Sequence, residues 1–159
     1  MNDTPRILIA EDDVNDLMLT RRALSRFRQG LPVKDFQTGV AILEYLQASL
    51  PLEQTAEQRP GLILLDIKMP LMGGLEVLEQ IREKRLCPAT PIVIYSSSQE
   101  PRDIARAYAA CANSFVRKPG DYVQYMEIIQ RLAAYWLDTN LTGAGLSLQF
   151  SEQGAAGLG

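Results

Sequence analysis

The segment GLILLDIKMPLMGG, residues 61–74, contains the first residue whose type and position could do chemistry. Its apolar run stops at the carboxylate of Asp66, which is followed by Pro70 and then by two glycines. In open parallel sheets, ligands bind just outside the carboxyl ends of the strands, so an acid at that point favours a chemical role over packing. We therefore predict that Asp66 is a nucleophile.

Polar side chains also follow three other apolar segments. Glu11 and Asp12 follow RILIA, Ser96 ends IVIYS, and Lys118 comes shortly after SFV. In a doubly wound sheet of strand order 2-1-3-4-5, the first and third strands are neighbours. We therefore expect Glu11 and Asp12 to lie beside Asp66, with Ser96 and Lys118 at the same edge.

Carboxylates placed so close together repel one another. At about 4 Å and an effective dielectric constant near 20, each pair costs about 4 kcal/mol, so the cluster must take up protons or a cation. Oxygen ligands of this kind suit Mg²⁺. A cation and a nearby ammonium also neutralise charge in phosphoryl transfer. Asp66 would then attack phosphorus and become an aspartyl phosphate, while Lys118 and the Ser96 hydroxyl contact the phosphoryl oxygens.

Each of these residues has a purely structural alternative. Acids are favoured at the start of a helix, and an Asp often stabilises a turn before a proline. Serine runs are usually loops, and a single lysine is usually solvated. We prefer the functional interpretation because the groups fall at one edge, strand after strand.

Short apolar runs alternate with amphipathic segments along the chain, which is typical of βα units around a parallel sheet. We predict strands at 6–10, 33–37, 61–66, 92–96 and 114–116, and helices at 13–28, 40–48, after Gly74, from 101, and at 121–137. The fold class is α/β, a flavodoxin-like doubly wound sheet of five parallel strands in the order 2-1-3-4-5, with five helices on both faces. We expect residues 1–138 to form one domain and residues 139–159 to form a flexible tail.

Composition excludes several functions. The chain has no histidine, which rules out a serine triad, a histidine-ligated zinc site and a phosphohistidine donor. A net charge of -3 argues against nucleic acid as a partner. No apolar run approaches the roughly 20 residues that span a bilayer, and no secretory signal is evident, so we expect no membrane contact and a cytoplasmic location. Cys87 and Cys111 are expected to be reduced.

The segments ILIAEDD, LILLDIKMP, IVIYSSS and FVRKP, in this order, resemble the receiver domain of bacterial two-component response regulators. The resemblance spans about residues 6–137. It implies that Asp66 is the phosphoacceptor, with Ser96 and Lys118 contacting the phosphoryl group. It also implies that Glu11, Asp12 and the backbone carbonyl of Lys68 help to hold Mg²⁺.

The same resemblance implies further features. Phe115 would be the switch aromatic, and the Lys118–Pro119 bond would be cis, as in most of the family. Gly73 stands where the family often has Asp, and Ser96 replaces the commoner Thr. A narrower likeness, to the stand-alone receivers of bacterial phytochromes, makes a sensor histidine kinase the expected partner, with a bacteriophytochrome as a candidate.

The last helix is expected to carry the signal outward. Its apolar positions sweep roughly 200° on a helical wheel, which is more than one core face needs. We predict a homodimer through this helix, the strand before it and the helix from 101 to 111. The predicted contacts include Tyr122, Tyr125, Ile128, Tyr135 or Trp136. The alternative is a deeply packed helix that the tail partly covers.

Two other functions compete with the receiver. A phosphatase of the haloacid dehalogenase type also uses an Asp nucleophile, but it needs a second Asp two residues later, where this chain has Lys68. Its general acid is therefore missing. An adaptor that binds a kinase without being phosphorylated would not need the intact acidic cluster.

Overall fold

The computed structural model describes residues 5–49 and 59–141. The predicted tail at 139–159 therefore lies largely outside the described residues. Strands and helices alternate in the described parts. The strands are β1 (Ile7–Ala10), β2 (Val33–Phe36), β3 (Leu62–Leu65), β4 (Ile92–Ser96) and β5 (Ser114–Arg117). The helices are α1 (Val14–Phe27), α2 (Gly39–Ser49), α3 (Gly74–Glu83), α4 (Pro101–Ala109) and α5 (Tyr122–Ala133), followed by a π-helical turn (Ala134–Thr139).

The five strands form one parallel sheet in the order β2-β1-β3-β4-β5, which confirms the predicted topology. β1 and β3 are neighbours, and Ala10 pairs in register with Leu65. The residue after each of them is an acid, Glu11 or Asp66. The register therefore places these two acids side by side where the strands end.

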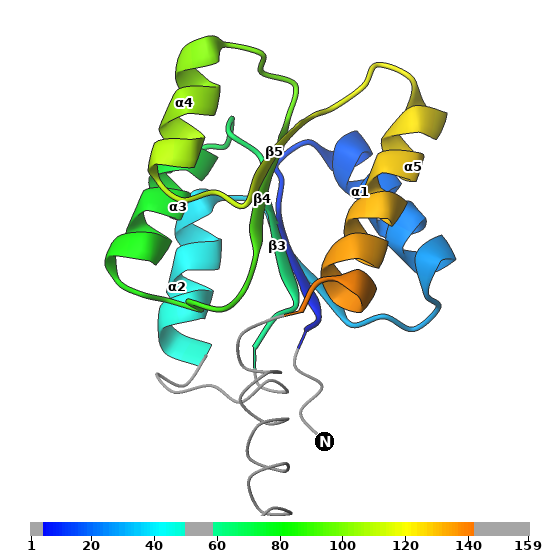
Figure 1. Cartoon of the computed structure of the whole chain (residues 1–159), viewed down its shortest axis with the longest axis horizontal. Coiled ribbons are helices and arrows are strands. Elements are labelled where there is room, and N and C mark those ends of the chain that lie inside the picture. Colours follow the sequence, from blue (N-terminus) through cyan, green and yellow to red (C-terminus); the bar gives the residue numbers. More distant parts are fainter. Residues whose placement is uncertain (1–4, 50–58, 142–159) are drawn as a thin grey trace, which may run out of the picture.

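Helices cover both faces of the sheet, as predicted. Figure 1 shows α1 and α5 on one face and α2, α3 and α4 on the other. Alternate strand residues are divided between the two layers: Leu8 and Ile63 face α2 and α3, whereas Ile9 and Leu64 face α1 and α5. Because both faces are covered, the central strands β1 and β3 are apolar along their whole length.

Two helices begin at aspartate caps. The Asp13 carboxylate accepts the Asp16 backbone N–H at 2.9 Å, which confirms the predicted start of α1. Asp121 caps α5 in the same way through Gln124. The α-helix was expected to continue to residue 137, but it ends at Ala133 and the chain continues in a π-helical turn. An apolar sequence pattern does not distinguish an α-helix from a π-helical turn. It indicates which side chains are buried and not which backbone groups are hydrogen-bonded.

Candidate functional site

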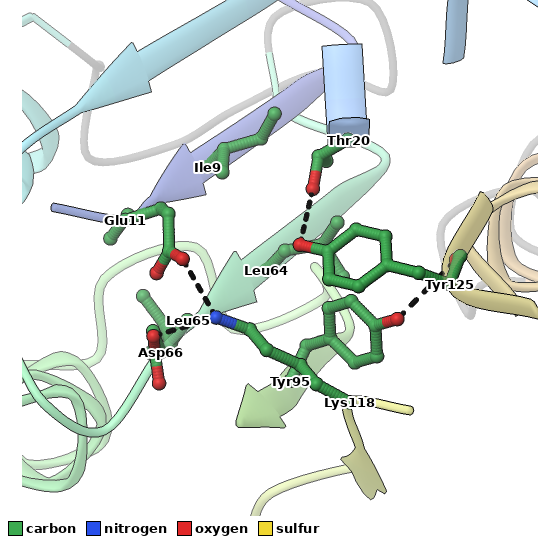
Figure 2. Close-up of a pocket in the computed structure, with 10 residues that line it drawn as sticks. Ile9, Glu11, Thr20, Leu64, Leu65, Asp66, Tyr95, Lys118 and Tyr125 are labelled. Atoms are coloured by element: carbon green, nitrogen blue, oxygen red, sulfur yellow. Dashed lines mark hydrogen bonds and ion pairs between the residues drawn. The ribbon is translucent and has the colours of Figure 1, made fainter. Parts of the chain in front are cut away.

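The carboxyl edge of the sheet brings Glu11, Asp66 and Lys118 together (Figure 2). Glu11 and Asp66 directly follow the neighbouring strands β1 and β3, and Lys118 directly follows β5. The Lys118 backbone N–H donates to the carbonyl of Ser96, the last residue of β4, at 2.8 Å. The residues predicted from four strand ends therefore lie at one edge.

The Lys118 ammonium is the centre of the cluster. Its Nζ lies 2.7 Å from Glu11 Oε1, 2.8 Å from Asp66 Oδ2 and 2.9 Å from Asp16 Oδ2. Only 7 % of the lysine side chain is exposed. An ammonium has three N–H donors, so these contacts use all of them. A charged lysine is held in a buried place because acids surround it.

Burial and neighbouring charges change the acidity of these groups. Burial raises the pKa of Glu11 to about 9, and the closeness of the Asp66 carboxylate adds to the rise. Burial alone would raise the pKa of Asp66, but hydrogen bonds with Glu11 and Lys118 outweigh it and lower that pKa. Burial alone would lower the pKa of Lys118, but hydrogen bonds to Asp66 and Glu11 reverse the shift. The Asp66 carboxylate is therefore kept ionised beside a positive charge.

The acidic residues fit a hard divalent cation. Glu11, Asp12 and Asp66 each offer an oxygen, and these oxygens lie within 4.8 Å of one another. The second Glu11 oxygen, Oε2, is buried and has no hydrogen-bond partner. A buried acceptor without a donor is costly, and a bound cation would satisfy it. This donor set, all oxygen and rich in charge, suits Mg²⁺ or Mn²⁺.

The segment after Asp66 returns tightly to the sheet, and Gly74 makes this possible. The Gly74 N–H donates to the Ile67 carbonyl at 2.9 Å. A Cβ added at Gly74 would lie 1.9 Å from the Asp66 carbonyl oxygen, so only glycine allows α3 to begin this close. Asp66 Oδ1 also accepts the Ile67 N–H at 2.7 Å. The Asp66 side chain is therefore held by the loop that follows it.

Comparison with known proteins identifies the family. The model of the response regulator receiver domain matches residues 7–130. This chain belongs to the response regulator receiver domain family. The resemblance inferred from the four sequence segments is thereby confirmed.

Individual relatives agree with this assignment. The probable methanogenesis regulatory protein FilR2 of Methanothrix harundinacea is 31% identical over 134 residues, which cover 84% of each chain. Response regulator Rcp1 of Synechocystis sp. is 27% identical over 133 residues, covering 84% of this chain and 89% of Rcp1. The structure of its Mn²⁺-bound form has a TM-score of 0.74, covering 87% of this chain and 98% of Rcp1. The structure of the phosphorylated cyanobacterial phytochrome response regulator RcpA is 28% identical in sequence and has a TM-score of 0.76. The match covers 88% of this chain and 99% of RcpA.

The two residues predicted to form the switch lie on neighbouring strands, Ser96 at the end of β4 and Phe115 within β5. Ser96 is fully buried, and its hydroxyl accepts the Ser98 backbone N–H at 3.3 Å. Phe115 on β5 is half-buried against the α2–α4 side of the core. Its backbone N–H donates to the Tyr108 hydroxyl of α4 at 3.1 Å. Phe115 is therefore connected to α4 through its backbone.

One implied feature is wrong in this structure. The Lys118–Pro119 bond was expected to be cis, but the described chain contains no cis peptide bond. The trans form of an X–Pro bond is favoured by about 0.5–1 kcal/mol. Lys118 reaches Asp66 with this bond trans.

Sequence reasoning missed Asp16 as a site residue. It lies in the first turn of α1, where its backbone N–H donates to the Asp13 cap. Its carboxylate also contacts Lys118, which is 102 residues away. The one available signal was position, because the first turn of α1 directly follows β1 and so lies at the carboxyl edge of the sheet.

The predicted interface residues do not form one surface. Tyr125 was expected among the partner contacts, but it is only 3 % exposed, so this prediction is wrong. Its ring contacts Tyr95 at 5.0 Å between centroids and its hydroxyl reaches α1, so α5 buries this position against α1 and the sheet. Tyr122 lines a groove with Arg22 and Arg26 of α1. The other predicted residues, Ile128, Tyr135 and Trp136, line a separate groove of about 420 Å³ beside the start of β5.

The described helices do not include one that is long and apolar enough to cross a membrane.

Proposed function

We propose that this receiver domain accepts a phosphoryl group from a sensor histidine kinase onto Asp66, with Mg²⁺. The observation that carries the proposal is the convergence of Asp66 with Lys118 and with two further acids that can share a cation. The existence of RcpA in a phosphorylated form and of Rcp1 in an Mn²⁺-bound form supports it. The roles of the individual residues are part of the proposal.

The chemistry is an in-line displacement at phosphorus. An Asp66 carboxylate oxygen forms a bond to phosphorus while the bond from phosphorus to the donor nitrogen or oxygen breaks, and the donor leaves with that electron pair. Lys118 neutralises the phosphoryl oxygens and the Ser96 hydroxyl donates to one of them. Mg²⁺, when bound, supplies further neutralisation of charge. Glu11, Asp12, Asp66 and the Lys68 carbonyl would hold it.

A phosphohistidine donor has to lie on another protein, because this chain has no histidine of its own. We propose a phytochrome-type sensor kinase in the cytoplasm, since RcpA is named as a phytochrome response regulator. FilR2, which is also similar to this chain, is named as a probable regulator of methanogenesis and not as a phytochrome response regulator. A histidine kinase donor is therefore the general proposal, and a phytochrome as that kinase is the more specific one.

Output would pass through the α4, β5 and α5 face. A phosphoryl group adds a charge of about -1.5 to -2 at pH 7, which would draw the Ser96 hydroxyl toward Asp66. Phe115 could then move inward, and its hydrogen bond to Tyr108 would carry the change to α4. We propose that a homodimer forms through the groove lined by Ile128, Tyr135 and Trp136.

Sedimentation tests the homodimer with two matched tyrosines. Tyr135 is 49 % exposed in the groove beside β5, and Tyr122 is 59 % exposed in the groove beside α1. We expect the wild type to dimerise, Tyr135→Glu to be monomeric at the same concentration, and Tyr122→Glu to behave as the wild type, because a charge opposes burial of an apolar interface. A wild type that stays monomeric at high concentration, with and without beryllofluoride as phosphoryl mimic, would rule the dimer out.

The acceptor function is tested with acetyl phosphate. After incubation with Mg²⁺, we expect the intact mass to increase by one phosphoryl group, and we expect no increase when Mg²⁺ is chelated. A phosphatase would instead release inorganic phosphate over many turnovers. A kinase-binding adaptor would show neither product, and either of these outcomes would refute the proposal.

A further inference from the structure

The Lys118 ammonium is paired with one acid that the cation cluster does not contain. Asp16 Oδ2 lies 2.9 Å from Lys118 Nζ, as close as the contacts from Glu11 and Asp66. The oxygens that can share a cation belong to Glu11, Asp12 and Asp66. Asp16 therefore contacts the lysine and not the candidate metal site.

The position of Asp16 is itself fixed by α5. Its backbone carbonyl accepts the Tyr125 hydroxyl at 3.2 Å, and that hydroxyl is also hydrogen-bonded to Thr20, one turn along α1, at 2.9 Å (Figure 2 shows the Thr20 contact). Thr20 and Tyr125 are buried. The Tyr95 hydroxyl of β4 donates to the Tyr125 carbonyl at 3.3 Å. Two elements of the core therefore hold the first turn of α1 where Asp16 meets Lys118.

The number of donors indicates what Asp16 does during the reaction. All three ammonium N–H groups are used, by Glu11, Asp16 and Asp66. When an oxygen of Asp66 bonds to phosphorus, its carboxylate loses its negative charge and accepts hydrogen bonds less strongly. The N–H that pointed at Asp66 then becomes available to a phosphoryl oxygen. The two other acids keep the ammonium in place during this exchange.

We propose that Asp16 is a positioning residue for phosphoryl transfer, which holds the Lys118 ammonium toward Asp66 before and after the phosphoryl group arrives. This inference rests on the proposed function. Without the Asp16 carboxylate, the ammonium has an unused donor and a less fixed direction. The loss should reduce the rate of the chemical step and leave binding of the small phosphodonor nearly unchanged.

The test compares Asp16→Asn with Asp13→Asn. Both variants remove one negative charge from the start of α1, and Asn can replace Asp as a helix cap. Asp13 contacts the Asp16 backbone and not the lysine, so it controls for charge and for helix stability. At saturating Mg²⁺ we expect Asp16→Asn to lower the maximal phosphorylation rate by about five- to tenfold, because a neutral amide holds an ammonium less strongly than a carboxylate does. We expect Asp13→Asn, and the half-saturating acetyl phosphate concentration of both variants, to stay near wild type.

Proton NMR of the ¹⁵N-labelled Lys118 ammonium gives a readout that does not depend on phosphorylation. We expect Asp16→Asn to shift the Nζ signal and to accelerate its hydrogen exchange, with Asp13→Asn unchanged and Asp16→Glu intermediate. Equal effects of Asp16→Asn and Asp13→Asn on the rate, or an unchanged Nζ signal in Asp16→Asn, would overturn the inference. If the wild type takes up no phosphoryl group, the proposed function fails, and the Nζ signal alone decides whether Asp16 holds the ammonium.

Discussion

Asp66→Asn is expected to abolish uptake of a phosphoryl group from acetyl phosphate. The amide fills the same space, and the Ile67 N–H can still donate to its oxygen. It offers no anionic oxygen to attack phosphorus, and it removes one charge from the group of acids that can share a cation. Intact mass after incubation with Mg²⁺ and acetyl phosphate should show the unmodified variant alone.

Asp35→Asn is the matched control for this loss. Asp35 lies on the edge strand β2 and pairs with Arg21 on the surface, so its replacement removes one charge without touching the site. We expect this variant to be phosphorylated like the wild type. Uptake of a phosphoryl group by Asp66→Asn would show that another side chain is the acceptor.

Lys118→Ala should have two large effects that Mg²⁺ separates. It leaves Glu11, Asp16 and Asp66 close together without their cation, and removing one partner of a buried ionic cluster costs about 3–5 kcal/mol of unfolding free energy. Mg²⁺ should restore part of this loss by binding the acids. Even at saturating Mg²⁺, the phosphorylation rate should fall by about 10²–10³-fold, as for other groups that stabilise charge in a transition state. Denaturant unfolding and the rate of mass gain measure the two effects.

Arg106→Ala provides the comparison for Lys118→Ala. Arg106 pairs with Glu79 between α4 and α3, with both side chains nearly half exposed. An exposed pair of this kind contributes about 0–1 kcal/mol, so the unfolding free energy should hardly change and Mg²⁺ should have no special effect. If Lys118→Ala were phosphorylated at the wild-type rate, the ammonium would have no part in the transfer.

The sheet and the position of Asp66 at its edge could be predicted because they depend on local patterns. The apolar runs that become β1, β3 and β4 are short and continuous, and in each case a polar residue lies at or directly after the strand end. The doubly wound order then places the residues after β1 and β3 side by side. The register of Ala10 with Leu65 agrees with that expectation.

The features that were missed depend on how side chains from segments far apart in the sequence point toward one another. Asp16 and Lys118 are 102 residues apart, and a helix-start pattern does not show that an acid also points toward another strand end. The last helix looked broadly apolar, but the buried positions form a narrower stripe at spacings of three and four residues: Tyr125, Met126, Ile129 and Ala133. The helical wheel indicated that the last helix has a broad apolar face, but it did not show which tyrosine would be buried at the centre of that face. Packing of α5 against α1 decides that.

The most direct test of the account is to locate the phosphoryl group by chemistry. Borohydride reduces an aspartyl phosphate to homoserine, so peptide mass mapping after phosphorylation and reduction identifies the acceptor. We expect homoserine at position 66 alone, and only in samples that contained Mg²⁺. Reduction at another acid, or no reduced residue in a sample with Mg²⁺ and phosphodonor, would contradict it.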